Sequence, residues 1–218
     1  MTRHLFLTSA IGTPGVGESI RQKLGHNKPL KTAFITTPIE PQSEQADLSW
    51  VEEDKVALQN NGFEIFDYTI TGKAENEIKA DLADIEVLYV SGGNDFYLKQ
   101  QSNKCYFDQF VKEFVESGKP YIGTSAGSII AGTDMSPSLQ ITDKEAVDDP
   151  DHMDLTGFGL VNFTIMPHWG SPWFREAYLN KRLTTMYDSS PPLILLRDTQ
   201  YVEVIDGSCC IVDVMKDQ

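Results

Sequence analysis

The chain has 218 residues, of which 40% are hydrophobic, so it is long enough to bury a substantial core. Its 18 basic and 32 acidic residues give a net charge of -14 at pH 7. This balance disfavours nucleic acid and anionic membrane surfaces as partners, because both select basic surfaces, and it leaves small ligands open.

Apolar runs alternate with amphipathic segments through the first part of the chain, which starts with a short apolar run. That run is too short for a signal peptide and predicts the first buried strand. Strands are expected at 5–8, 32–37, 63–70, 86–90 and 121–124, and helices at 16–24, 45–60, 75–82 and 106–116. This βαβ alternation predicts an α/β fold with a largely parallel sheet covered by helices on both faces. Ligands of such sheets bind beyond the carboxyl ends of the strands.

The last third of the chain has a different pattern. It begins with a loop rich in acidic residues at 143–154 and continues with a strand at 162–166, a helix at about 172–186, and strands at 193–196, 201–205 and 210–214. Asp206-Gly207 between the last two strands predicts a terminal β-hairpin at the sheet edge. Because no linker, repeat or low-complexity tract divides the chain, we expect residues 1–218 to form one domain.

The cysteines indicate a reducing compartment. They are odd in number, two are adjacent and none has metal-ligand spacing: Cys105, Cys209 and Cys210. No segment approaches the roughly 20 apolar residues that are needed to span a bilayer. We therefore expect a cytoplasmic protein.

A Gly-Thr-Ser-Ala-Gly sequence at 123–127 follows the apolar run that ends the fifth strand. Gly-x-Ser-x-Gly is typical of a nucleophile elbow, a sharp strand-to-helix turn that exposes the Oγ of its serine. Glycines on both sides are needed because side chains there would collide with the neighbouring strand and helix. We predict Ser125 as a nucleophile, and the N–H of Ala126 at the helix start as an oxyanion donor.

A nucleophilic serine needs a base and an acid that orients the base. His168 is the best base, because it stands where the apolar strand at 162–166 ends. The other histidines open a strand or lie in polar loops: His4, His26 and His152. Asp198 follows the apolar strand at 193–196 in the same way and is the predicted acid. Glu203 is the alternative, but it lies within an alternating strand, where it can face solvent.

A second oxyanion donor is expected from Ser-Gly-Gly-Asn at 91–94, which follows a strand and precedes helical residues. Gly93, or else Gly92, could direct its N–H toward the reacting carbonyl. The segment lacks the patterns of phosphate-binding loops. The acidic loop at 143–154 could supply metal ligands, but it lacks EF-hand spacing, so we predict no metal site. Its position after the elbow makes it a candidate lid.

Three of these motifs together resemble the family of serine peptidases that includes dipeptidase E (aspartyl dipeptidase) and, more distantly, cyanophycinase. They are Ser-Gly-Gly-Asn at 91–94 with Phe96 and Leu98, Tyr-Ile-Gly-Thr-Ser-Ala-Gly at 121–127, and Pro-His at 167–168. The resemblance spans nearly the whole chain. It implies a flavodoxin-like, three-layer sandwich like that of class I glutamine amidotransferases, with a serine in place of the amidotransferase cysteine.

The resemblance also implies site residues. The family's nucleophile corresponds to Ser125, its base to His168 and its oxyanion donors to Gly93 and Ala126. Its acid, which stands in a Leu-Pro-Glu-Gly context, corresponds to Asp198, where this chain reads Leu-Arg-Asp-Thr at 196–199. The third member of the triad thus departs from the family pattern.

Dipeptidase E removes an N-terminal aspartate from dipeptides, so a similar site would need a cation for the side-chain carboxylate. Arg182 and Arg175, on the helix after His168, are candidates, and the alternative is that they lie on a solvated helix surface. Asn94 is a further candidate for substrate binding. The segment at 169–174 and the loop at 134–154 depart from dipeptidase E.

The sequence therefore predicts a cytoplasmic serine exopeptidase that acts on small peptides through an acyl-enzyme and requires no cofactor. An amidotransferase-like module without catalysis, which binds a small ligand or a partner chain, is the alternative of another class. An esterase or amidase with a non-peptide substrate would use the same machinery. The sequence leaves open whether the chain is a monomer or a homodimer.

Overall fold

Within the part of the chain that the structure describes, seven strands form the central sheet, in the order β3-β2-β4-β5-β1-β8-β9. The computed structural model describes all residues except 1, 26–27, 43–44, 141, 188–190 and 216–218. The strands are β1 His4–Thr8, β2 Leu30–Ile35, β3 Phe63–Tyr68, β4 Val87–Val90, β5 Tyr121–Thr124, β8 Gln200–Ile205 and β9 Ser208–Asp213. The first five pair in parallel, and β8 and β9 are antiparallel. Continuous apolar runs suit such strands, because both of their faces are covered.

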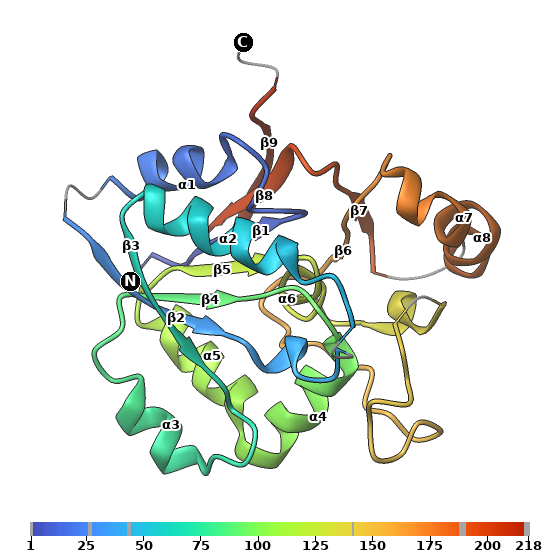
Figure 1. The fold of residues 1–218 in the computed structure, drawn as a ribbon, viewed down its shortest axis with the longest axis horizontal. Coiled ribbons are helices and arrows are strands. Elements are labelled where there is room, and N and C mark those ends of the chain that lie inside the picture. The colour runs from blue at the N-terminus through green and yellow to red at the C-terminus, as the bar shows by residue number, and fades with distance from the viewer. Residues whose placement is uncertain (1, 26–27, 43–44, 141, 188–190, 216–218) are drawn as a thin grey trace.

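Helices cover the two faces of this sheet (Figure 1). Helices α1 Val16–Leu24 and α2 Ser49–Asn60 lie on one face, and α3 Glu75–Asp81, α4 Asp95–Cys105 and α5 Phe107–Glu116 lie on the other. The side chains of β1 alternate between two core clusters, because Phe6 packs with α1 and α2 and Leu5 and Leu7 pack on the opposite side. The predicted three-layer α/β fold is confirmed. No helix among the described residues is long and apolar enough to cross a membrane.

The C-terminal part contains a second, two-stranded parallel sheet, β6 Thr164–Met166 with β7 Leu193–Leu195. The predicted terminal hairpin is present, and its turn residues Asp206 and Gly207 have φ of 48° and 86°, the left-handed values that an Asp-Gly turn favours. β9 lies at the edge of the main sheet.

Two predicted helices differ from those in the structure. The helix expected at 45–60 begins only at Ser49, whose N–H donates to Asp47 Oδ1 at 2.9 Å and so forms a turn before the helix. The helix expected at 172–186 is a run of short turns of changing pitch: η3 Pro172–Phe174, α7 Arg175–Ala177, η4 Tyr178–Arg182 and α8 Leu183–Met186. A wide π-type turn at η4 interrupts the regular pitch.

Strand β1 lies between β5, which runs parallel to it, and β8, which runs antiparallel. The carboxyl end of β1 therefore adjoins both the end of β5 and the start of β8. The N–H of Ser125 donates to the Thr8 carbonyl at 3.1 Å, which ties the end of β5 to that of β1. This edge of the sheet is where parallel α/β folds place their ligands.

Candidate active site

Ser125 stands at a sharp turn between β5 and the short helix α6 Ala126–Ile129. Its backbone is strained, with φ 48° and ψ -107°. The flanking glycines allow close packing around it. A Cβ on Gly123 would lie 2.5 Å from the Gly127 carbonyl oxygen, and one on Gly127 would lie 2.1 Å from the Val90 carbonyl oxygen. The steric reason for the Gly-x-Ser-x-Gly spacing is thus confirmed.

His168 and Asp198 lie beside this serine. The Nε2 atom of His168 is 3.0 Å from Ser125 Oγ, and its Nδ1 atom is 2.7 Å from Asp198 Oδ1. The three residues come from three different chain segments, the ends of β5 and β6 and the connection between β7 and β8. The structure therefore brings together the three side chains that the sequence singled out.

The ionisation of Asp198 sets the tautomer of the histidine. Burial raises the pKa of Asp198, but hydrogen bonds from His168 and Ser9 outweigh it and hold that pKa below its usual range. The carboxylate can only accept, so Nδ1 of His168 carries a proton and Nε2 is left to accept the proton of the Ser125 hydroxyl. The arrangement can perform general-base activation of a nucleophile.

Glu203, the alternative acid, is not part of this group. Its carboxylate lies 3.0 Å from His4 Nε2 and 2.5 Å from Lys23 Nζ, and the residue is only 6% exposed. Through these two contacts, the Glu203 side chain links β8 to β1 and α1. The geometry thus favours Asp198 over Glu203.

The glycine-rich turn at 91–94 lies next to the serine, as the oxyanion hypothesis requires. A Cβ placed on Gly92 would be 3.4 Å from the Cβ of Ser125 and 3.2 Å from the ring of Trp50. Gly93 has φ 126°, and a side chain there would lie 2.2 Å from the Pro38 carbonyl oxygen. Only glycine fits this position.

Two aromatic rings lie close to this site, one beside Gly92 and one on His168, and sequence reasoning missed both. Trp50, from α2, lies against Gly92. The ring of Phe174, from η3, stacks on the imidazole of His168. No motif marks either residue, because their contacts depend on how distant segments pack.

A family model described as Peptidase family S51 matches residues 12–212. This chain belongs to peptidase family S51. An uncharacterized peptidase of Listeria monocytogenes, Lmo0363, is 31% identical over 140 residues, which cover 63% of this chain and 65% of that protein. The chain thus matches slightly less than two thirds of the length of Lmo0363. PM1590, an uncharacterized peptidase of Pasteurella multocida, is 30% identical over 146 residues, 66% of this chain and 68% of its own.

Peptidase E of Shewanella amazonensis is 35% identical over 88 residues, 40% of this chain and 35% of that protein. Two crystal structures share the fold of this S51 family member. A candidate peptidase E protein from Listeria monocytogenes EGD-e has a TM-score of 0.84 at 22% identity, covering 98% of this chain and 99% of that one. A peptidase from an acI-B1 actinobacterium has a TM-score of 0.70 at 18% identity, covering 98% and 88%. The family assignment supports peptidase activity.

The predicted substrate residues of this S51 family member lie in different surroundings. Asn94 caps α4: its Oδ1 accepts from the Tyr97 N–H at 2.9 Å, and its Nδ2 donates to the Asp143 carbonyl at 2.8 Å. Arg175 is exposed at the start of α7.

Arg182 is buried rather than on a solvated helix surface, and is 4% exposed. Its Nε donates to the Pro137 carbonyl at 3.0 Å, and another guanidinium nitrogen donates to the Tyr178 hydroxyl at 3.1 Å. The segment η2 Ser136–Gln140 supplies the first of these contacts. These bonds give Arg182 a structural role inside the protein.

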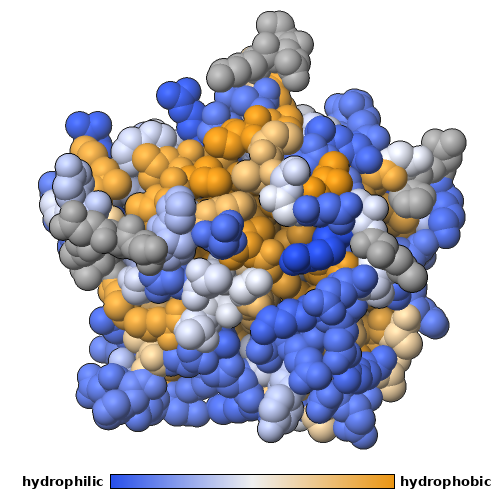
Figure 2. Space-filling model, turned by 180° about the vertical axis from the view of Figure 1, so that it is seen from behind, coloured by the Kyte–Doolittle hydropathy of each residue, from blue (hydrophilic) through white to orange (hydrophobic). Residues whose placement is uncertain are grey.

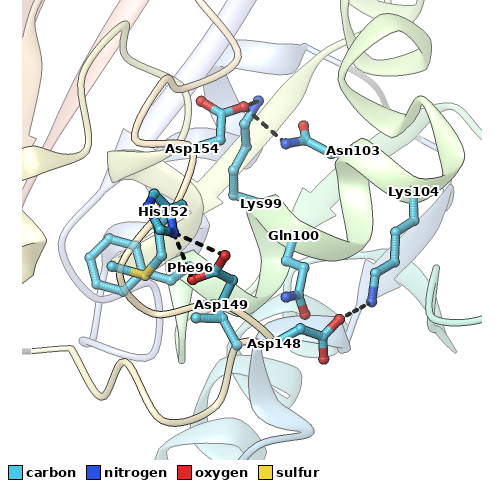
Figure 3. A pocket seen from close by; sticks show the side chains of 11 residues that line it. Phe96, Lys99, Gln100, Asn103, Lys104, Asp148, Asp149, His152 and Asp154 are labelled. Atoms are coloured by element: carbon cyan, nitrogen blue, oxygen red, sulfur yellow. Dashed lines mark hydrogen bonds and ion pairs between the residues drawn. The ribbon is translucent and has the colours of Figure 1, made fainter.

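The acidic loop packs against α4 and forms a pocket of about 330 Å³ with it (Figure 3). Lys104 lies 2.9 Å from Asp148, and Lys99 lies 3.3 Å from Asp154, so lysines of α4 neutralise part of the loop. Among the residues that the structure describes, no His, Cys, Asp or Glu side chains are grouped as a metal ion would need. The pocket is lined by α4 and the loop, and Ser125 is not among its lining residues.

Proposed function

We propose that this S51 family member is a serine exopeptidase that cleaves small peptides through Ser125, His168 and Asp198. The observation that carries the proposal is the continuous hydrogen-bonded chain from Ser125 Oγ through His168 to Asp198, with distances of 3.0 and 2.7 Å. Nucleophile, base and orienting acid are thereby within the reach that covalent catalysis requires. The sharp turn at Ser125 acts as a nucleophile elbow.

In the proposed mechanism, His168 Nε2 accepts the hydroxyl proton as Ser125 Oγ attacks the peptide carbonyl. Asp198 stabilises the imidazolium that results. The N–H groups of Gly93 and Ala126 bind the oxyanion. The imidazolium then protonates the leaving amine, and the acyl ester on Ser125 remains. A water molecule, deprotonated by His168, attacks this ester. The bond between the acyl carbon and Ser125 Oγ then breaks, and the imidazolium returns its proton to Oγ as the carboxylic acid leaves.

Dipeptides with an N-terminal aspartate are the first substrates that we propose. Arg175 is the better of the two cationic candidates, because it is exposed and follows Phe174, whose ring contacts His168. A guanidinium there could pair with a substrate carboxylate. Arg182 already uses its guanidinium on internal partners.

The test compares the wild-type protein with Ser125→Ala on a panel of Asp-X and neutral X-Leu dipeptides, with release of free amino acids as the readout. Ser102→Ala is the matched control, because Ser102 is buried on α4 and its hydroxyl has no hydrogen-bond partner in the described part of the chain. We expect hydrolysis by the wild type and the control only. A wild type that cleaves no peptide but hydrolyses simple esters would favour a non-peptide substrate, and full activity of Ser125→Ala would refute the mechanism.

We also infer a cytoplasmic location. Cys105, Cys209 and Cys210 are free thiols, and the last two are exposed on β9. Exposed free thiols suit a reducing compartment.

A further inference from the structure

Ser9 links two residues of the proposed triad through a single oxygen atom. It follows β1 directly and is completely buried. Its Oγ lies 2.7 Å from Asp198 Oδ1 and 2.7 Å from the backbone nitrogen of His168. A carboxylate only accepts and an amide N–H only donates, so the hydroxyl donates to Asp198 and accepts from His168. Both hydrogen-bonding functions of Ser9 are therefore directed at the triad.

The Asp198 carboxylate needs such support because it lies in the connection between β7 and β8, with 39% of its side chain exposed. Its Oδ1 receives both the Ser9 hydroxyl and Nδ1 of His168. A carboxylate at a partly exposed position can rotate toward water. The buried hydroxyl holds Oδ1 in the direction from which the imidazole approaches.

The backbone of His168 needs support for a different reason. Its φ of 62° lies in the left-handed region, which non-glycine residues rarely adopt. The N–H of His168 donates to Ser9, and the next N–H, that of Trp169, donates to the Leu196 carbonyl at 2.8 Å. These two bonds hold the turn that directs the imidazole toward Ser125.

We propose that Ser9 is a positioning residue of the peptidase site, which fixes the His168 and Asp198 side chains relative to each other. The inference rests on the proposed function, because it assumes that these residues activate Ser125. A purely structural serine would change stability when replaced but would not change the reactivity of folded protein. The two roles can therefore be separated by experiment.

The first experiment measures the rate at which a fluorophosphonate probe labels Ser125, which requires no knowledge of the natural substrate. We expect Ser9→Ala to label about 10- to 100-fold more slowly than wild type, as expected for lost hydrogen bonds to a charged group. Ser9→Thr, which keeps the hydroxyl, should recover most of the rate, and Ser102→Ala should match wild type. Labelling of folded Ser9→Ala within twofold of wild type would overturn the proposal. If Ser9→Ala does not fold, Ser9→Cys, a weak donor, replaces it.

A double-mutant cycle tests whether Ser9 acts through Asp198. In the Asp198→Ala background, we expect Ser9→Ala to slow labelling by a much smaller factor than in wild type. An undiminished effect in that background would contradict action through Asp198.

Proton NMR separates this inference from the proposed function. The Nδ1 proton of His168, bonded to Asp198, should give a downfield resonance in the wild type that shifts or broadens in Ser9→Ala and is unchanged in Ser102→Ala. If the probe labels no serine in the wild type, the proposed function fails, and this resonance still tests Ser9. A resonance that is identical in wild type and Ser9→Ala would overturn the positioning role.

Discussion

The ring of Phe174 lies nearly parallel to the imidazole of His168, with ring centroids 4.7 Å apart and planes inclined by 12°. This stack limits rotation of the imidazole and shields one of its faces. Replacement by leucine keeps an apolar side chain but removes the stacking, which is worth roughly 0.5–1.5 kcal/mol for aromatic pairs. We expect Phe174→Leu to lower kcat about 2- to 10-fold with little change in KM.

The neighbouring Trp173→Leu is the control, since Trp173 is 92% exposed. Steady-state kinetics on the best dipeptide of the panel measures both variants. An equal loss in Trp173→Leu would show that the effect comes from the helical segment as a whole.

Asp198 and Glu203 offer a paired test of the acid. Asp198→Asn should lower kcat on the order of 1,000-fold or more, because a neutral amide neither fixes the same tautomer nor stabilises an imidazolium. Glu203→Gln should keep activity within a few-fold, because Glu203 pairs with His4 and Lys23. Its thermal midpoint should fall, since Lys23 loses its buried carboxylate partner. A large loss of kcat in Glu203→Gln together with near-normal activity of Asp198→Asn would show that Glu203 is the acid.

Gly127 should tolerate no side chain. A Cβ there would lie 2.1 Å from the Val90 carbonyl oxygen, which is fixed in the central sheet. We expect Gly127→Ala to reduce the free energy of unfolding by about 3 kcal/mol or more. Gly159→Ala is the matched control. Gly159 has φ 66° and no atom within 4 Å of an added Cβ, so only backbone strain of about 1 kcal/mol is expected. Chemical denaturation compares the two, and equal losses would contradict the steric argument.

Asp54 should make stability depend on pH. Burial raises its pKa from 3.8 to about 6, although hydrogen bonds from Tyr89 and Gly12 oppose this rise. The folded protein therefore binds this proton more tightly than the unfolded chain. The contribution of this proton to the free energy of unfolding is fully present below pH 3.8, declines as the pH rises toward about 6 and is absent above that. The free energy of unfolding changes by about 3 kcal/mol in total over this range.

Asp54→Asn removes the titration and can keep bonds to both partners. We expect its free energy of unfolding to fall less than that of wild type between pH 4 and about 7. Urea unfolding at several pH values measures the difference. Parallel pH profiles for the two proteins would show that Asp54 does not titrate in this range.

Much of the sheet could be predicted because a buried strand has a distinct pattern. The runs at 5–8 and 121–124 are short, apolar and bounded by turn residues, and both are strands in the structure. The same pattern predicted a strand at 162–166, where β6 forms. The pattern does not show with which other strand a strand pairs. β6 pairs with β7 outside the main sheet, and only packing determines that choice.

The proximity of the three residues of the proposed triad could be predicted because each of them follows an apolar strand. Ser9 follows a strand too, but serine is common at such positions and no spacing relates it to Asp198. From the sequence, Arg182 was a candidate for binding a substrate carboxylate, with a solvated helix surface as the alternative. It is buried because η2, from a distant part of the chain, covers it, and no local pattern encodes such docking.

The distribution of apolar side chains on the surface does not indicate where the candidate site lies. Figure 2 shows apolar and polar residues intermixed on the face turned away from the view of Figure 1. The most exposed large apolar side chains are scattered over several elements, with Trp173 and Tyr187 the most exposed among the described residues. Scattered apolar residues of this kind are normal on protein surfaces.

The central position of β1 has a consequence for the order in which the chain is synthesised. Ser125 can take its place once β5 has paired with β1. Asp198 comes much later in the chain, just before β8, which pairs with the opposite side of β1. A nascent chain can therefore complete its parallel half while still lacking the acid that orients the histidine. Under the proposed mechanism, proteolytic activity arises only after Asp198 has left the ribosome, so nascent chains that end before it would carry a nucleophile without its full catalytic partners.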